Sequence, residues 1–285
     1  MPVTIKKLSL GKFNIYGLRE GFFSLDGGAM FGVVPKTLWT KKTPSDDLNR
    51  IKIALNSLLI DNGVDLILVE TGIGNKFNNK FSDIYSIEIK PGLIPLLNEI
   101  GIKPEDINYV INTHLHFDHC GGNTRLNSKG EIIPSFPHAK YIIQKKEWKH
   151  ALQPNERDKA SYLKENFLPL EQFGVVDLIE GQKKISKGVE VIKIPGHTEN
   201  HQCVKIKTSE DVVFFLGDLV PTSSHIGIPY IMSYDLFPLK TLENKKKVFD
   251  QSIEEDWILA FNHDARYFFG KIRKEGEKYK FKPLD

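Results

Sequence analysis

Three histidines and an aspartate lie within six residues of this sequence, in the run Asn112-Thr113-His114-Leu115-His116-Phe117-Asp118-His119-Cys120-Gly121-Gly122. Imidazole and carboxylate groups are the side chains that bind zinc, iron and manganese in proteins. The run follows the apolar residues 109–111, which are typical of the end of a buried strand. Because open α/β folds place their sites at the carboxyl ends of strands, the run predicts metal chemistry at such an end.

Further side chains that can bind a metal follow three later apolar segments: His197 after residues 189–194, Asp218 after 212–216, and His263 after 257–261. A lone histidine at a strand end is usually only a hydrogen-bonded polar residue, but a set spread over four strand ends is hard to explain in that way. One tetrahedral ion uses four ligands, so this set indicates two divalent ions, with zinc as the first choice and iron or manganese as alternatives. The predicted ligands are His114, His116, Asp118, His119, His197, Asp218 and His263.

The segments around these residues predict a mixture of strands and helices. Residues 55–69 predict a hairpin of two strands around the turn sequence Asp61-Asn62-Gly63. Residues 91–100 predict a helix with one apolar face, and a second helix, rich in charge, is predicted from Lys145 to about Leu170. An amphipathic helix is predicted over residues 242–254.

These segments fall into two similar sets, roughly residues 1–175 and 176–285, with no glycine-rich, serine-rich or proline-rich linker between them. We therefore expect one domain, residues 1–285, built of two halves that share a core. Because hairpins coexist with helix-bridged strands, the predicted fold class is α/β, with two mixed β-sheets and external helices rather than one parallel sheet.

The composition is that of an ordinary globular protein. The 39 basic and 36 acidic residues give a formal charge of +3, so a polyanionic partner is not expected. The basic runs 245–247 and 271–282 are interpreted as solvated surface rather than as a nucleic-acid site. The beginning of the chain lacks the apolar core of a signal peptide, and no apolar run approaches the roughly 20 residues that span a bilayer. We expect a cytoplasmic protein with a small-molecule substrate and no nucleic-acid or membrane partner, and a homodimer stays open.

The string 113–119, with Gly196-His197-Thr198, Gly217-Asp218 and the late His263, resembles the motifs of the metallo-β-lactamase fold superfamily of hydrolases. The order and spacing of the motifs match from the predicted hairpin to His263. This resemblance implies an αββα four-layer sandwich with a dinuclear metal site along one edge. It also implies that His114, His116 and His197 bind one metal, that Asp118, His119 and His263 bind the other, and that Asp218 bridges them.

Residues 25–35 resemble the lid-like loop of the superfamily branch that contains N-acyl-homoserine lactonases and methyl parathion hydrolase. The segment is apolar and rich in glycine, so a packed part of the core is an equal alternative. Lactonases of this branch have a tyrosine shortly after the bridging aspartate, where this chain has Pro221-Thr222-Ser223. The residues that we expect near the substrate are Met30, Phe31, His225, Tyr230 and Tyr234.

The expected reaction is hydrolysis of an ester, lactone or thioester by a hydroxide that bridges the two metal ions. Asp118 has the predicted catalytic role, because it could orient this nucleophile and move its proton. Carboxylates or backbone carbonyls are expected to fix the histidine rings, with Asp264 as one candidate for His263, and His201 either supports the site or begins a helix. Two other functions stay open: a phosphodiesterase or phosphotriesterase with the same metal geometry, and a non-catalytic metal-binding or sensor protein.

Overall fold

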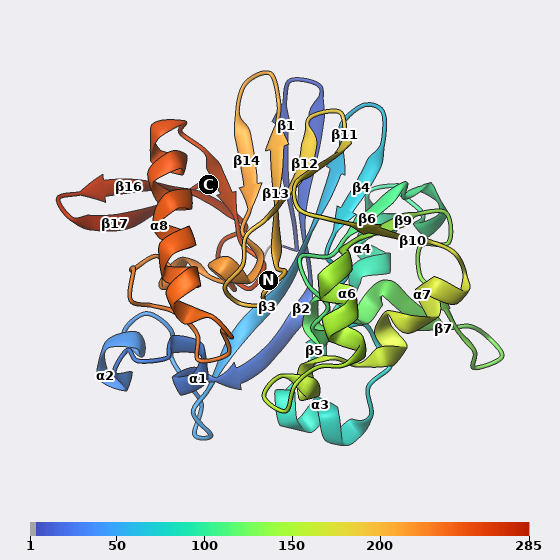
Figure 1. Cartoon of the computed structure of the whole chain (residues 1–285), viewed down its shortest axis with the longest axis horizontal. Coiled ribbons are helices and arrows are strands. Elements are labelled where there is room, and N and C mark those ends of the chain that lie inside the picture. Colours follow the sequence, from blue (N-terminus) through green and yellow to red (C-terminus); the bar gives the residue numbers. More distant parts are fainter. Residues whose placement is uncertain (1–3, 285) are drawn as a thin grey trace.

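The computed structural model describes residues 4–284 and contains two β-sheets packed face to face, with helices on both outer sides (Figure 1). The first sheet contains, in spatial order, β1 (Ile5–Leu10), β2 (Phe13–Asp26), β3 (Arg50–Asp61), β4 (Leu66–Val69), β6 (Tyr109–Ile111), β9 (Lys140–Gln144) and β10 (Val176–Ile179), and β5 (Glu88–Ile89) pairs with β2. The second contains β11 (Lys183–Ser186), β12 (Val189–Lys193), β13 (Gln202–Lys207), β14 (Val212–Phe215), β15 (Ile258–Ala260), β16 (Phe269–Glu275) and β17 (Lys278–Pro283). A separate small hairpin joins β7 (Thr124–Leu126) and β8 (Ile132–Pro134).

Both sheets are mixed, because β4, β6, β9 and β10 are parallel neighbours in the first and β14 and β15 are parallel in the second, among antiparallel pairs. The helices are α1 (Gly27–Phe31), α2 (Lys36–Trp39), α3 (Asn79–Tyr85), α4 (Leu93–Glu99), α5 (Phe117–Cys120), α6 (Lys145–Leu152), α7 (Leu168–Gln172) and α8 (Pro238–Glu254). Figure 1 shows α4, α6 and α7 outside one sheet and α8 outside the other. The predicted αββα sandwich of two mixed sheets is confirmed.

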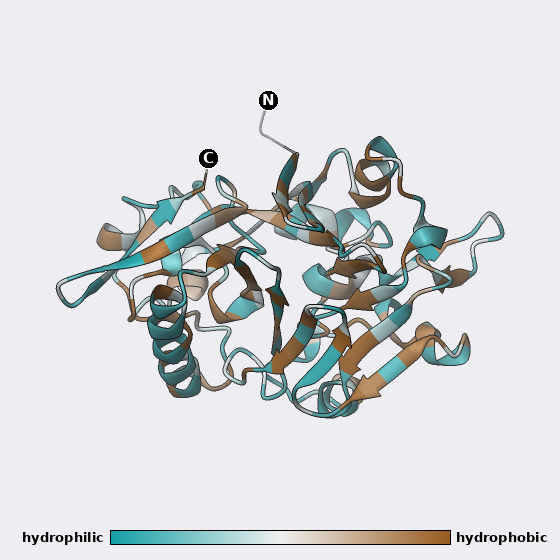
Figure 2. Cartoon of the chain, turned by 90° about the horizontal axis from the view of Figure 1, so that it is seen from above, coloured by the Kyte–Doolittle hydropathy of each residue, from teal (hydrophilic) through white to brown (hydrophobic). Residues whose placement is uncertain are grey.

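Alternation along the strands supplies the core layers. In β3, Leu58 and Ile60 point to the space between the sheets, whereas Leu59 points to the helices outside the first sheet. In β14, Val213 faces the other sheet and Phe214 packs under α8. Each side chain of this kind contributes about 2 kcal/mol when it is fully buried. Figure 2 shows apolar colour concentrated on the central strands and hydrophilic colour along α8.

The predicted long helix from Lys145 to Leu170 is wrong. The helix α6 ends at Leu152, and Pro154 follows, whose ring and missing N–H group cannot continue a helix. Two short 3-10 turns, η3 (Lys159–Ser161) and η4 (Lys164–Asn166), separate α6 from α7. The other long helix, α8, begins earlier than predicted, at Pro238, because proline is well suited to the first helical position. No helix within residues 4–284 has the length and apolar character needed to cross a membrane.

Backbone hydrogen bonds join the two sheets at one edge. Ala54 N donates to His263 O at 3.0 Å and Asn56 N donates to Asn262 O at 2.9 Å, so the segment after β15 is held against β3 of the other sheet. Gln202 N donates to Thr113 O at 3.0 Å, which ties β13 to the segment after β6 in the same way. The strand ends that carry the predicted ligands are therefore fixed to one another by main-chain contacts.

Glu20 is a buried carboxyl group in β2 that supports the segment after β4. Its side chain is 3% exposed, and its Oε1 accepts a hydrogen bond from Ile73 N at 3.1 Å. A Cβ atom on Gly72, where φ is +64°, would lie 1.4 Å from this oxygen, so only glycine fits there. Burial raises the pKa of Glu20 to about 8.

The raised pKa of Glu20 gives a pH-dependent prediction. The neutral carboxyl favours the folded chain below the ordinary pKa of 4.5, and this contribution is lost as the pH rises through about 8. We expect Glu20→Gln to gain stability relative to the parent protein as the pH rises between these values, by roughly 1.4 kcal/mol per pH unit. Urea denaturation of both proteins across this pH range measures the difference, and a difference independent of pH would contradict the assignment.

Candidate metal centre

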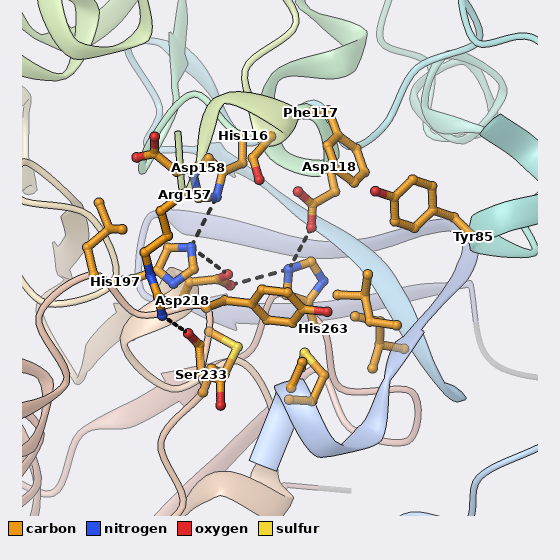
Figure 3. Close-up of a pocket in the computed structure, with 18 residues that line it drawn as sticks. Tyr85, His116, Phe117, Asp118, Arg157, Asp158, His197, Asp218, Ser233 and His263 are labelled. Atoms are coloured by element: carbon orange, nitrogen blue, oxygen red, sulfur yellow. Dashed lines mark hydrogen bonds and ion pairs between the residues drawn. The ribbon is translucent and has the colours of Figure 1, made fainter. Parts of the chain in front are cut away.

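Four strand ends bring the predicted ligands to one place. His114 and His116 follow β6, and Asp118 lies in α5, the short helix that comes directly after them. Across the sheet interface, His197 follows β12, Asp218 follows β14 and His263 follows β15. Figure 3 shows side chains from both sheets, His116 and Asp118 from the first and His197, Asp218 and His263 from the second, pointing toward one another at the bottom of a cavity.

The seven predicted ligands form two adjoining groups. In each of three triads, His114–His116–His197, His114–His119–Asp218 and Asp118–His119–His263, the ligand atoms lie within 4.8 Å of one another. Asp218 stands between the groups, with one carboxylate oxygen 3.4 Å from His197 Nε2 and the other 3.3 Å from His263 Nε2. The first and third triads contain the same residues as the two ligand sets that the sequence resemblance implies, and the second triad joins them.

The imidazole nitrogens of the two groups are placed as ligands of a cation would be. His197 Nε2 lies 3.1 Å from His116 Nδ1, and His263 Nε2 lies 3.2 Å from His119 Nε2, so nitrogen faces nitrogen in both groups. The buried Nε2 atom of His114 has no hydrogen-bond partner among the described residues. Because unpaired polar atoms are costly inside a protein, a divalent ion that contacts His114 Nε2 would satisfy an atom that the described chain leaves unpaired.

Hydrogen bonds on the far side of the rings orient them. His197 Nδ1 lies 2.9 Å from Asp235 Oδ1, and the other oxygen of this carboxylate accepts from Thr241 Oγ1 at 2.7 Å. His263 Nδ1 lies 2.8 Å from Ala54 O. Contacts of this kind fix the tautomer of a metal-binding imidazole and aim its Nε2 atom at the ion.

Of the two kinds of partner expected for the ring of His263, the structure shows a backbone carbonyl and not the carboxylate of Asp264. The backbone carbonyl of Ala54, not Asp264, lies against the ring of His263. Asp264 instead accepts hydrogen bonds from Ser223 N at 2.7 Å and from Arg266 N at 2.8 Å, so it shapes the loops around the site. His201 begins no helix, and its Nε2 accepts from Asp218 N at 3.1 Å, which places the backbone of Asp218.

Electrostatic conditions favour metal binding. Burial lowers the pKa of His114 and His116 well below the usual range, so both rings stay neutral and able to bind a cation. For His119, burial also acts to lower the pKa, but Asp118 and other nearby carboxylates outweigh it and raise the pKa well above the ordinary value. The raised pKa of His119 shows that the carboxylates around it favour a positive charge, which a divalent cation would supply in place of a proton.

Glu147 links the two chain segments that carry His114, His116 and His197. This carboxylate of α6 is 1% exposed. Its Oε1 accepts from Leu115 N at 3.2 Å and from Tyr162 Oη at 2.9 Å, and its Oε2 accepts from Thr198 Oγ1 at 2.8 Å. Leu115 lies between two predicted ligands and Thr198 follows a third, so one side chain bonds residues adjacent to all three.

A cavity of about 360 Å³ opens above the ligands, within the size range of small-molecule sites (Figure 3). Its floor is polar and its walls are largely apolar. The lining residues include the apolar side chains Leu25, Met30, Ile53, Phe117, Met232 and Leu236. The hydroxyl of Tyr85 points toward Asp118 in Figure 3, and burial raises its pKa, so the hydroxyl stays protonated.

The five residues expected near the substrate divide into two sets. Met30 and Tyr234 line the cavity. Phe31, His225 and Tyr230 are not part of the cavity wall, so the expectation that they lie near the substrate stays a prediction. Phe31 is fully buried and stacks on His225 at a ring distance of 4.6 Å, and Tyr230 meets its edge at 6.1 Å. Phe31 is adjacent in sequence to Met30, which lines the cavity, but the aromatic rings that pack against Phe31 hold it in the core.

Residues 25–35 contribute both to the cavity wall and to the core. Their first part ends β2, and α1 follows, with Met30 facing the cavity and Phe31 facing inward. Because successive residues of a helix point in different directions, the same turn supplies both a cavity wall and a core anchor. The two alternatives from the sequence each describe one side of this helix.

Several residues of the site carry no clear sequence signal. Glu147 lies in the middle of a charged helix, and Arg157 and Asp158 lie in a stretch that was predicted to be helical. Glu70 could have been found, because it follows β4 just as the predicted ligands follow their strands. Its Oε1 accepts from Thr113 N at 3.0 Å and lies 3.4 Å from His119 Nδ1.

Comparison with known proteins agrees with this geometry. The family model described as the metallo-beta-lactamase superfamily matches residues 53–263. An N-acyl homoserine lactonase from Bacillus cereus is 28% identical over 229 residues, which cover 76% of this chain and 83% of that protein.

Two solved structures are similar over nearly the whole chain. A probable metal-dependent hydrolase from Staphylococcus aureus has a TM-score of 0.89 and 28% identity, covering 98% of this chain and 99% of that one. AidC, described as a dizinc quorum-quenching lactonase in complex with a product, has a TM-score of 0.81 at 18% identity, covering 99% and 97%. At that identity, the second likeness shows the fold alone.

The position of Glu147 predicts an effect on metal affinity. Glu147→Ala removes the acceptor shared by Leu115 N and Thr198 Oγ1, so we expect zinc affinity to fall about 10- to 100-fold. Glu147→Gln should retain most of the affinity, because its oxygen can still accept from Leu115 N while its amide donates to Thr198. Competition with a chromogenic chelator measures this, with the exposed Glu171→Ala on α7 as the control. Unchanged affinity in Glu147→Ala would contradict the proposed role.

Met30 and Phe31 form a matched pair. We expect Met30→Ala to change the relative rates on long and short substrates, because it enlarges the cavity. Phe31→Ala is expected to lower the free energy of unfolding by about 3–5 kcal/mol, because it empties a fully buried position. Denaturation curves and substrate profiles of both variants test the division, which fails if Phe31→Ala changes substrate preference without loss of stability.

Proposed function

The chain belongs to the metallo-beta-lactamase superfamily and is a metal-dependent hydrolase, and from this premise we propose that it opens a lactone, or cleaves a related ester or thioester, at two divalent metal ions. The observation that carries the proposal is the position of the cavity. Its floor contains His116 and His197 from one ligand group, Asp118 and His263 from the other, and Asp218 between them. A substrate in this cavity would place its reacting bond against both groups at once.

The ligand division follows from the triads. His114, His116 and His197 would hold one ion, Asp118, His119 and His263 the other, and Asp218 would contact both. Zinc suits this set of imidazoles and carboxylates, and iron or manganese would also be accepted. Two ions held there would supply a hydroxide nucleophile near neutral pH and would polarise a carbonyl group.

The protein side chains supply orientation and proton transfer. Asp118 lines the cavity, with its Oδ2 3.5 Å from His263 Nε2, so it can orient the attacking water and accept its proton. Tyr85, whose hydroxyl faces Asp118, can donate a hydrogen bond to a substrate oxygen (Figure 3). Tyr234 can do the same from another wall, since burial raises its pKa to about 12 and keeps the hydroxyl protonated.

The walls favour an acyl substrate over a phosphoryl one. Leu25, Ile53 and Met232 bury apolar groups well, and Arg157 is the one lysine or arginine among the lining residues that could pair with the oxygens of a phosphodiester. The relatives named as N-acyl homoserine lactonases support the same choice. A phosphodiesterase and a non-catalytic metal-binding protein are the alternatives that an assay must separate.

A substrate panel tests this proposal. We expect the zinc- or manganese-loaded protein to hydrolyse a lactone or thioester faster than a phosphodiester. Asp218→Asn should lose at least about 100-fold in kcat/KM, because it removes charge shared by both ligand groups. Asp256→Asn, at an exposed side chain, is the control. Preferred turnover of the phosphodiester would support the phosphodiesterase, and no turnover by metal-loaded protein would support the binding protein.

A further inference from the structure

Arg157 is the single lysine or arginine among the 18 residues that line the cavity. It lies in the irregular stretch between α6 and η3, and it is exposed, which places it at the mouth of the cavity rather than at its floor. Figure 3 shows its side chain extending past His197 to Ser233, where Nη2 donates to the Ser233 carbonyl at 2.5 Å. This contact holds the guanidinium group beside the path from solvent to the metal centre.

The charge of Arg157 is not neutralised by the surrounding protein. Within residues 4–284, no carboxylate oxygen lies within 4.0 Å of its guanidinium nitrogens. The neighbouring carboxylate, Asp158, is instead paired with His150, whose Nε2 lies 2.6 Å from Asp158 Oδ2. A charged side chain at the mouth of a site, with no acidic partner in the described chain, is suited to a charged group that arrives with the ligand.

The guanidinium group also has donors to spare. It carries five N–H bonds in a planar fork, and the one acceptor bonded to it in the described chain is the Ser233 carbonyl. A carboxylate matches this fork with two parallel hydrogen bonds, which are shorter and stronger than those to a neutral carbonyl. The contact to Ser233 limits the motion of the side chain, so less rotamer entropy is lost when an anion binds.

On the basis of the proposed function, we propose that Arg157 is an anion subsite and that the substrate carries a carboxylate remote from its reacting carbonyl. The reacting carbonyl lies at the polar floor, the middle of the substrate contacts apolar walls such as Met232 and Leu236, and the carboxylate pairs with Arg157 at the mouth. The N-acyl homoserine lactones for which the relatives are named carry no such charge. The subsite therefore separates this chain's substrate from theirs.

A matched pair of lactones tests the subsite. One has an acyl side chain that ends in a carboxylate, and the other ends in a carboxamide of the same size. We expect the metal-loaded parent protein to prefer the carboxylate by about tenfold in kcat/KM, and Arg157→Gln to reduce this preference to about one by lowering kcat/KM for the carboxylate more than for the carboxamide. Arg157→Lys should restore part of the preference, because it keeps the charge without the fork.

Controls separate charge recognition from structure and from the reaction itself. Arg273→Gln, at an exposed position of β16, should behave as the parent protein. Equal loss on both lactones in Arg157→Gln would show that Arg157 only braces Ser233 and would overturn the subsite, as would a parent protein without preference. If neither lactone is hydrolysed, the proposed reaction fails, and calorimetric binding of the two corresponding lactams tests the subsite separately. Tighter binding of the carboxylate that depends on Arg157 supports the subsite. Equal binding of the two lactams overturns the subsite as well.

Discussion

The structure depends on one constraint: it buries imidazole and carboxylate groups close together at the meeting point of the two sheets. His197 and His116 meet nitrogen to nitrogen at 3.1 Å, and Asp218 lies between rings of both ligand groups. Such an arrangement is costly unless positive charge occupies the space between the groups. The rest of the fold must stabilise this arrangement. Metal ions bound between the groups would offset its unfavourable free energy.

The surrounding structure supplies the required rigidity through contacts that cross the two sheets. Main-chain hydrogen bonds from β3 fix the segment that carries His263, and Gln202 N fixes the segment that carries His114. Asp235 then holds His197, and Glu147 holds the adjacent Thr198. The cavity lies above this rigid floor, and its walls come from less regular segments such as 153–161 and α1. Chemistry is thus assigned to the strand ends and substrate choice to the loops.

The strand ends were predictable because two physical signals coincide there. An apolar run that ends in histidine or aspartate marks both a buried strand and a polar edge, and four such runs pointed to the fold and to seven side chains that the structure brings together. The supporting residues were not predictable in this way. Glu147 lies on a helix whose charged pattern is typical of a surface, and only the tertiary structure buries it. Phe31 and Met30 are adjacent and similar in polarity, so no sequence pattern reveals which of them faces the cavity. Pro154 did carry a signal, since it ends α6 and creates the irregular stretch on which Arg157 lies.

The central claim is that the two ligand groups hold two metal ions with Asp218 between them. Anomalous X-ray diffraction from crystals of the zinc-loaded protein tests it most directly. The account predicts two anomalous peaks about 3.5–4 Å apart, one among His114, His116 and His197 and the other among Asp118, His119 and His263, with Asp218 in contact with both. A single peak, or two peaks of which only one touches Asp218, would contradict it.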